Sequence, residues 1–263
     1  MDPLDLSSAS LRLEMTGRRA DVVLDDPAHR NAQTPAMWRA LAQLAERLDG
    51  QVDVVVISGA GPSFSAGLHR SAFAGNGEDP DSLPALARAP EPEVDRQIAL
   101  FQEAFTRWST SSFVTIAAVR GHAVGAGFQL ALAADLILAT PDARFAILEP
   151  TLGLVPDLGG TGRLLELVGY SRALEICATG RQIPADEALA LGLVTEVVPE
   201  DQLGPAVDAL AAPFLGAQRG AVLATRELLR EGARRTAADD DGRAAQLAAE
   251  RRAQIGRLRS LLG

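Results

Sequence analysis

The sequence predicts an α/β fold with a helical region towards its C-terminus, and three observations carry this prediction. Short apolar runs typical of buried strands alternate with helix-like segments up to about residue 200. From about residue 203 onward the pattern is helical. Apolar residues make up 47% of the 263 residues, which is enough to form a sizeable core. We therefore expect an α/β core over residues 1–200 and a helical region over residues 201–263.

The first part of the chain predicts a hairpin, a helix and a buried strand, in that order. Residues 11–15 and 20–24 form two short strand patterns with a Thr-Gly turn between them. Apolar side chains within residues 35–48 repeat on one helix face, and Thr34 is a suitable N-cap before the proline that opens this helix. Residues 52–57 form a continuous apolar run, which is typical of a strand buried on both faces.

The middle of the chain continues this alternation after a long loop. Residues 75–93 contain several glycines, prolines and acids, which predicts a mobile surface loop or lid. We expect a helix over 94–110, an apolar strand over 114–119, a helix over 127–134 and a short strand over 136–139. This order of elements is typical of an α/β core.

Acidic residues precede the last predicted helix, and the helix itself has many apolar positions. Three aspartates at 239–241 precede this helix and complement the positive end of its dipole. The alternative is a solvated acidic turn, and both can hold. The helix is too apolar for a free terminal helix, which predicts packing against further copies of the chain. The apolar positions are Leu247, Ile255, Leu258, Leu261 and Leu262.

The composition excludes several classes of function. Acidic residues exceed basic ones, 34 against 25, and a net charge of −9 argues against general nucleic-acid binding. No lysine is present, which excludes a Schiff-base lysine and a P-loop lysine. The single cysteine, Cys177, excludes an internal disulfide framework and a multi-cysteine zinc site, and we expect no metal. Neither a secretory signal nor an apolar stretch of roughly 20 residues is visible, so we expect a cytoplasmic protein without a membrane partner.

Two glycine-rich turns follow the predicted strands and suit the binding of an oxygen atom. The first is FSAGLH at residues 64–69, and the second is GHAVGAGFQLALAADL at residues 121–136. Small residues there allow a substrate to approach the backbone, and two converging N–H groups would form an oxyanion hole. A purely structural strand-to-helix turn is the alternative for each. A dinucleotide site is disfavoured, because the second turn lacks the third glycine and the later acidic residue of that motif.

A third segment, FAILEPTLGLVPDLGGTGRL at residues 145–164, contains two carboxylates among apolar residues. An apolar environment raises the pKa of a carboxyl group and suits it to proton transfer near neutral pH, so Glu149 and Asp157 are candidate acid/base groups. The alternative is structural: Glu149 would cap the turn before Pro150, and Asp157 would N-cap a helix starting near Gly159.

These three segments, in this order and at these separations, resemble the crotonase superfamily of enoyl-CoA hydratases and isomerases. Further similarity covers DDPAHRNAQ at residues 25–33 and ATGRQIPADEALALGLVTEVVP at residues 178–199. The resemblance implies a spiral of ββα units with a C-terminal helical region. It also implies a coenzyme A thioester bound in an extended groove and assembly as homotrimers or hexamers.

The resemblance places the binding positions of the family on this chain one by one. The oxyanion N–H groups fall at Leu68 and Ala126, each preceded by a glycine, Gly67 and Gly125, that we assign to substrate binding. The positions that line the coenzyme A entrance are Ala28, His29, Arg30, Ala32, Ala66 and His69. The family commonly has Asp where this chain has His69, and we interpret this departure as sequence drift rather than a contact with coenzyme A.

The catalytic positions depart further from the hydratases of the family, which use two glutamates. The first falls at Gln129, an amide that cannot exchange protons, and the second at Glu149. A position that is usually glycine in hydratases is Asp157 here. Acids occur there in dienoyl-CoA isomerases, in ring-modifying acyl-CoA isomerases and in an aryl-CoA dehalogenase. The dehalogenase has Trp in place of Glu149, which weakens that analogy.

The resemblance therefore implies an enzyme that stabilises a thioester enolate, and we expect an isomerase that moves a double bond along an acyl-CoA. Glu149 would act as the base, and Asp157 or Glu149 would return the proton. An enoyl-CoA hydratase, with Gln129 only positioning the water, is the alternative, and a non-catalytic acyl-CoA binder is a third. No separate cofactor is expected, because coenzyme A is part of the substrate.

Overall fold

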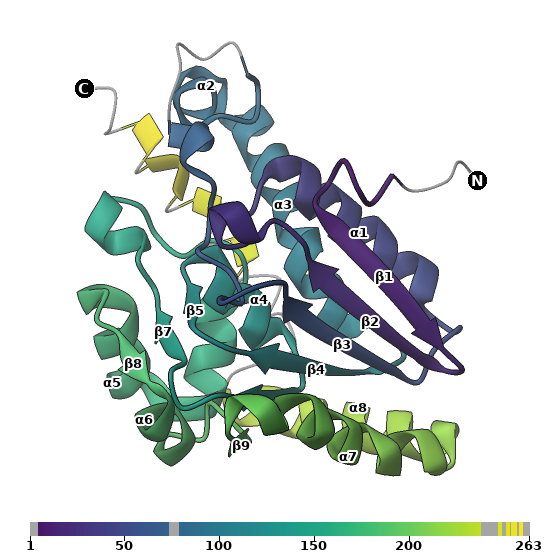
Figure 1. Ribbon diagram of the computed structural model, residues 1–263. Helices are drawn as coiled ribbons and strands as arrows, with labels where there is room; N and C mark the ends of the chain where they lie inside the picture. Colours follow the sequence, from purple (N-terminus) through teal and green to yellow (C-terminus); the bar gives the residue numbers. More distant parts are fainter. Residues whose placement is uncertain are drawn as a thin grey trace.

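The computed structural model describes residues 5–73, 79–237, 247–248, 251–252, 254–256 and 258–259. Two sheets form the framework of the chain (Figure 1). The six-stranded sheet has the order β1 (Leu11–Thr16), β2 (Arg19–Leu24), β3 (Val54–Gly59), β4 (Val114–Val119), β6 (Leu136–Ala139) and β9 (Glu196–Val197). The three-stranded sheet has the order β5 (His122–Val124), β7 (Arg144–Ala146) and β8 (Ile183–Pro184).

Helices surround both sheets (Figure 1). They are α1 (Pro35–Leu48), α2 (Leu83–Arg88), α3 (Glu91–Thr110), α4 (Ala126–Ala133), α5 (Gly160–Thr179), α6 (Ala185–Ala190), α7 (Leu203–Gly216) and α8 (Arg219–Ala237). The described residues beyond 246 are also helical. None of the helices among the described residues is long and apolar enough to cross a membrane. The mixed sheet-and-helix architecture with a helical C-terminal region agrees with the fold class predicted from the sequence.

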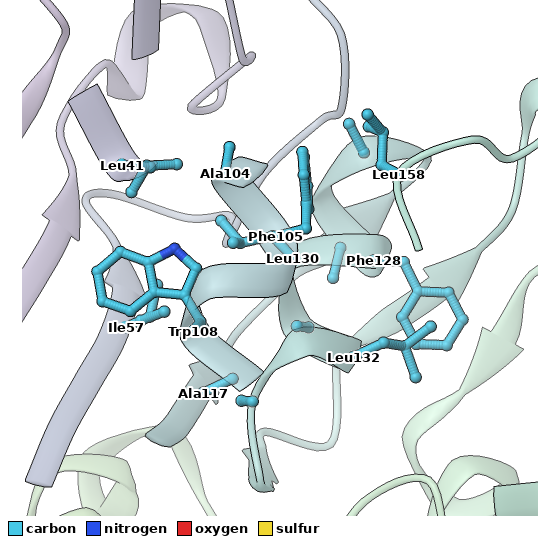
Figure 2. Packing of buried hydrophobic residues seen from close by; sticks show 14 of the residues in the cluster. Leu41, Ile57, Ala104, Phe105, Trp108, Ala117, Phe128, Leu130, Leu132 and Leu158 are labelled. Carbon is cyan, nitrogen blue, oxygen red and sulfur yellow. The ribbon is translucent and has the colours of Figure 1, made fainter. Parts of the chain in front are cut away.

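Alternating residues of β3 explain why this strand reads as a continuous apolar run. Val55 and Ile57 face a large core that includes residues of α1, α3 and α4. Val54 and Val56 face a second, smaller core that includes residues of α7. Both faces of the strand are thus covered, as parallel strands require. Figure 2 shows part of the larger core, in which Phe105 and Phe128 are among the buried side chains.

Most of the elements expected from local sequence patterns are present. The N-terminal strands form an antiparallel hairpin, and the Thr34 hydroxyl accepts the N–H of Met37 as the N-cap of α1. The predicted strand 52–57 lies two residues later, at Val54–Gly59. The three-stranded sheet was not predicted, because its strands are only two or three residues long.

The expected lid is more regular than its composition suggests. Within the loop predicted over 75–93, residues 74–78 are outside the described part, but residues 83–88 form α2 and α3 begins at Glu91 rather than at residue 94. Ser82 caps α2 by accepting the N–H of Ala85. The helix α2 and the first residues of α3 therefore replace much of the expected loop.

The C-terminal helical segment packs on its own chain. Ile255 and Leu258 are buried in the main core, so their apolar character requires no second copy of the chain. Leu261, Leu262 and the aspartates 239–241 lie outside the described residues.

Parallel pairing of the central strands sets the position of the site. The strands β2, β3, β4 and β6 are parallel neighbours, so their carboxyl ends meet at one edge of the sheet. The two glycine-rich turns follow β3 and β4 at this edge. Ser65 pairs in parallel with Ala123, which holds the first turn directly against the start of the second.

Candidate active site

A cavity lies where the two turns meet, and it contains most of the site residues predicted from the sequence. Its empty space is about 850 Å³, which includes space open to solvent. The predicted residues on its wall are Ala66, Gly67, Leu68, Gly125, Ala126, Glu149 and Asp157. The rest of the wall is largely apolar and includes Trp38, Leu86, Ile98, Phe101, Leu154 and Leu258.

The first turn presents the N–H of Leu68 to this cavity. The backbone N–H of Gln33 donates to Gly67 O at 2.7 Å, and the backbone oxygen of Gln33 accepts the N–H of His69 at 2.8 Å. The N–H of Leu68, which lies between these two residues, therefore points away from Gln33. Gly67 has a φ of +82°, and a Cβ there would lie 2.6 Å from Val124 O. Only glycine allows this close approach of the two turns.

The second turn presents the N–H of Ala126, the first residue of α4. Gly125, the N-cap residue, has a φ of +54° and supplies no side chain to cap the helix. The first N–H groups of a helix have no partner within the helix and carry partial positive charge. In the part of the chain that the structure describes, neither Leu68 nor Ala126 donates its N–H to a backbone acceptor.

Glu149 brings a buried carboxyl group to the same cavity. Its Oε1 accepts a hydrogen bond from Gln129 Nε2 at 2.8 Å. Its Oε2 is buried and has no hydrogen-bond partner among the described residues. Burial raises the pKa of Glu149 above its usual value, and the bond from Gln129 opposes this only in part. A carboxyl group with one fixed and one unpartnered oxygen is suited to accept and return a proton.

Gln129 holds Glu149 to the start of α5. Its Oε1 accepts the backbone N–H groups of Leu158 at 3.0 Å and Gly160 at 3.2 Å. Because the oxygen is occupied by two donors, the amide nitrogen must face Glu149. Gln129 is therefore a clamp in this structure, with no free acceptor of its own for a water or substrate proton.

Asp157 lines the cavity, and it is not the N-cap of the following helix. The N-cap of α5 is Gly159, without a capping side chain, so the structural alternative for Asp157 is wrong in that form. The N-cap residue of the turn at Glu149–Leu152 is Leu148, which supplies no capping side chain, and the structural alternative for Glu149 stays a prediction. The backbone oxygen of Asp157 accepts Gln102 Nε2 at 2.7 Å. Among the described residues, no three His, Cys, Asp or Glu side chains are grouped to hold a metal ion.

The predicted entrance residues, apart from Ala66, do not line this cavity. Ala28 and His29 belong to an exposed 3-10 turn, and Arg30 is exposed with a φ of 52°. Ala32 is buried. His29 and His69 lie edge to face, with ring centroids 5.2 Å apart. The interpretation of His69 as drift stays a prediction.

Several residues of the site were missed by sequence reasoning. Trp38 and Phe101 form an aromatic wall, with ring centroids 4.9 Å apart. Gln254 and Leu258 reach the cavity from the C-terminal segment, and Gln254 Oε1 accepts the N–H of Val155 at 3.1 Å. Helical periodicity identifies such residues as buried, but it does not separate a core position from a cavity wall.

The sequence and the structure are both similar to those of known proteins of one family. The family model for enoyl-CoA hydratase/isomerase matches residues 18–254. The "Probable enoyl-CoA hydratase EchA17" of Mycobacterium tuberculosis (strain ATCC 25177 / H37Ra) is 34% identical over 198 residues, which cover 74% of this chain and 71% of that relative. The crystal structure of a "putative enoyl-CoA hydratase" from Thermobifida fusca YX in complex with acetoacetyl-CoA is 42% identical, with a TM-score of 0.82 and 97% of each chain covered. That of an enoyl-CoA hydratase from Mycobacterium avium subsp. paratuberculosis K-10 is 26% identical, with a TM-score of 0.75 and coverage of 97% and 90%. The resemblance to the crotonase superfamily is thus confirmed, and the chain belongs to the enoyl-CoA hydratase/isomerase family.

Proposed function

We propose that this acyl-CoA enzyme is an enoyl-CoA isomerase that moves the double bond of the acyl chain from C3–C4 to C2–C3. Two features of the carboxyl and amide groups together carry the proposal. Glu149 has one carboxylate oxygen without a hydrogen-bond partner, and both the nitrogen and the oxygen of the Gln129 amide are already hydrogen-bonded. Double-bond migration needs one group that takes a proton and gives it back. Hydration also needs an attacking water, for which the amide oxygen of Gln129 is already occupied.

The proposed reaction begins with a 3-enoyl-CoA whose thioester oxygen accepts the N–H groups of Leu68 and Ala126. Glu149 takes a proton from C2, and the electrons of the C–H bond form an enolate on the thioester. The two N–H groups stabilise the negative oxygen, each worth typically about 3 kcal/mol. The dienolate then takes a proton at C4 and leaves a 2-enoyl-CoA. Either Glu149 returns the proton that it took, or a protonated Asp157 gives one and regains it from Glu149, directly or through water, before the next turnover.

The second candidate is an enoyl-CoA hydratase, and it is favoured by the names of the relatives, which are called hydratases. In this case Glu149 and Asp157 would share the acid and base roles around a water molecule, with Gln129 only fixing Glu149. A non-catalytic acyl-CoA binder is disfavoured, because a binder has no need of a buried, unpartnered carboxylate at the oxyanion hole.

Initial rates of the pure protein with a 3-enoyl-CoA and with a 2-enoyl-CoA test the proposal. An isomerase converts the 3-enoyl thioester faster than it forms 3-hydroxyacyl-CoA from the 2-enoyl thioester. The opposite order of rates would establish the hydratase instead. Absence of both activities, with acyl-CoA still bound, would support the binder.

We further propose that the reaction uses no separate cofactor, that it takes place in the cytoplasm, and that the enzyme is a homotrimer or hexamer. The assembly is supported by an apolar surface on α5, where Tyr170 is 71% exposed and Leu174, one turn later, is 51% exposed. Adjacent large apolar side chains on a helix surface are typical of contacts with another chain.

A further inference from the structure

Gln33 is a fully buried polar residue that the proposed mechanism does not use. It lies in the loop between β2 and α1, with 0% of its surface exposed. We propose that Gln33 is a positioning residue that sets the separation of the two oxyanion N–H groups and connects them to the aromatic wall of the acyl cavity. This inference rests on the proposed function, in which these N–H groups bind the thioester oxygen.

Gln33 holds the first turn through both its backbone and its side chain. Its backbone bonds to Gly67 and His69 bracket Leu68, the residue that supplies the first donor. Its Nε2 donates to Ser65 Oγ at 3.2 Å, and the same hydroxyl oxygen accepts the N–H of Gly67 at 3.2 Å. The backbone of Gln33 thus holds both sides of Leu68, and its side chain holds the residues just before Leu68.

The same side chain reaches the second turn and the cavity wall. Gln33 Nε2 also lies 3.4 Å from the backbone oxygen of Ala126, the residue that supplies the second donor. Its Oε1 accepts Trp38 Nε1 at 2.7 Å, and the Trp38 ring packs on Phe101 in the wall. An amide is suited to this place because it can both donate and accept, whereas a hydrocarbon would leave the buried indole N–H unpaired.

Both donors must be placed within about 0.5 Å to stabilise an enolate, so small displacements reduce turnover more than substrate binding. Gln33→Met keeps the length of the side chain but removes its hydrogen bonds. We expect kcat to fall about tenfold, less than the loss of a whole oxyanion donor, while KM changes less than about twofold. A larger rise in KM with kcat unchanged would show that Gln33 only shapes the cavity.

The infrared carbonyl stretch of a saturated acyl-CoA, labelled with ¹³C at the thioester, gives a readout that does not depend on the reaction. Two hydrogen bonds polarise the carbonyl and lower its frequency in the bound state. We expect a clear lowering in the unmodified enzyme and at most half of it in Gln33→Met. Thr115→Val is the matched control, because it removes a buried hydrogen bond to Trp108 O at 3.3 Å elsewhere in the core. It should keep the full lowering.

The outcomes separate this inference from the proposed function. An equal lowering in the unmodified enzyme and in Gln33→Met would overturn the role of Gln33 and leave the oxyanion hole intact. No lowering in the unmodified enzyme would overturn both. If Gln33→Met does not fold, Gln33→Glu decides, since it keeps the acceptor for Trp38 but, when ionised, has no donor for Ala126. A full lowering in that variant at neutral pH and above would refute the inference.

Discussion

Replacement of Gln129 by Glu distinguishes an isomerase from a hydratase, because it adds one negative charge beside Glu149 and changes little else in the site. In Gln129→Glu one carboxylate oxygen still accepts the N–H groups of Leu158 and Gly160, and the other faces Glu149 Oε1, which lies 2.8 Å from the present amide nitrogen. Two unit charges about 3 Å apart repel by roughly 5–6 kcal/mol at an effective dielectric constant of about 20. Even half of this energy corresponds to about 2 pKa units.

One proton is therefore expected on the pair at neutral pH, and it should reside on Glu149. The new carboxylate accepts two backbone N–H groups, which lower its pKa, whereas burial already raises the pKa of Glu149. A protonated Glu149 cannot remove the C2 proton. Isomerisation at pH 7 should then fall by at least about tenfold, and the activity should recover as the pH rises.

Initial rates of 3-enoyl isomerisation and 2-enoyl hydration, measured for both proteins from pH 6 to about 10, test this reasoning. Gln129→Met serves as the companion variant, because it loses the clamp without adding charge, and its rate should not recover at high pH. A clear rise of hydration in Gln129→Glu would identify a hydratase that lacks an acid. Unchanged isomerisation with an unchanged pH profile would refute the electrostatic argument.

Four further predictions concern the same site and the apolar surface of α5. Glu149→Gln should abolish turnover with little change in the affinity for acyl-CoA, and near-normal turnover would exclude Glu149 as the base. Because the folded-state pKa of Glu149 is raised, its ionisation costs stability as the pH rises above the usual value of 4.5, so thermal melts should show Glu149→Gln to be the more stable protein at pH 8 and equally stable at low pH. Asp157→Asn should lower the conversion of conjugated dienoyl-CoA more than that of simple 3-enoyl-CoA, and unchanged rates with both substrates would leave Asp157 a structural role only. Light scattering should show a trimer or hexamer at micromolar concentration, and Tyr170→Glu should weaken it; a monomeric unmodified protein would contradict the proposed assembly.

Local sequence patterns were sufficient to predict the hairpin, α1, and the strands β4 and β6, because each depends on periodicity or on a cap within a few residues. The two glycine-rich turns were also recognisable, since the need for a positive φ or a close backbone approach leaves glycine as the main choice. At Gly67 the structure shows both conditions.

Residues whose role depends on distant partners could not be assigned in this way. The sequence showed Gln129 only as a missing acid, whereas its role as a clamp arises from N–H groups about thirty residues away. The N-cap position of α5 is Gly159, so the alternative role of Asp157 as that N-cap also could not be judged from the sequence alone. Gln33 is the last residue of the segment DDPAHRNAQ, which was recognised from the sequence. The reason for its polar side chain is visible only in the structure, where it hydrogen-bonds to Trp38 and Ala126.

The pairing of β3 with β4 also has a consequence for the order of events during folding. Leu68 and Ala126 are far apart in the sequence, and they meet only after the parallel strands before them have paired. Parallel pairing closes a long loop and is intrinsically slow, whereas helices form from local contacts. Recovery of activity after dilution from denaturant should therefore lag behind the recovery of helical circular dichroism, and we expect the proposed oxyanion hole to be among the last parts of the enzyme to form.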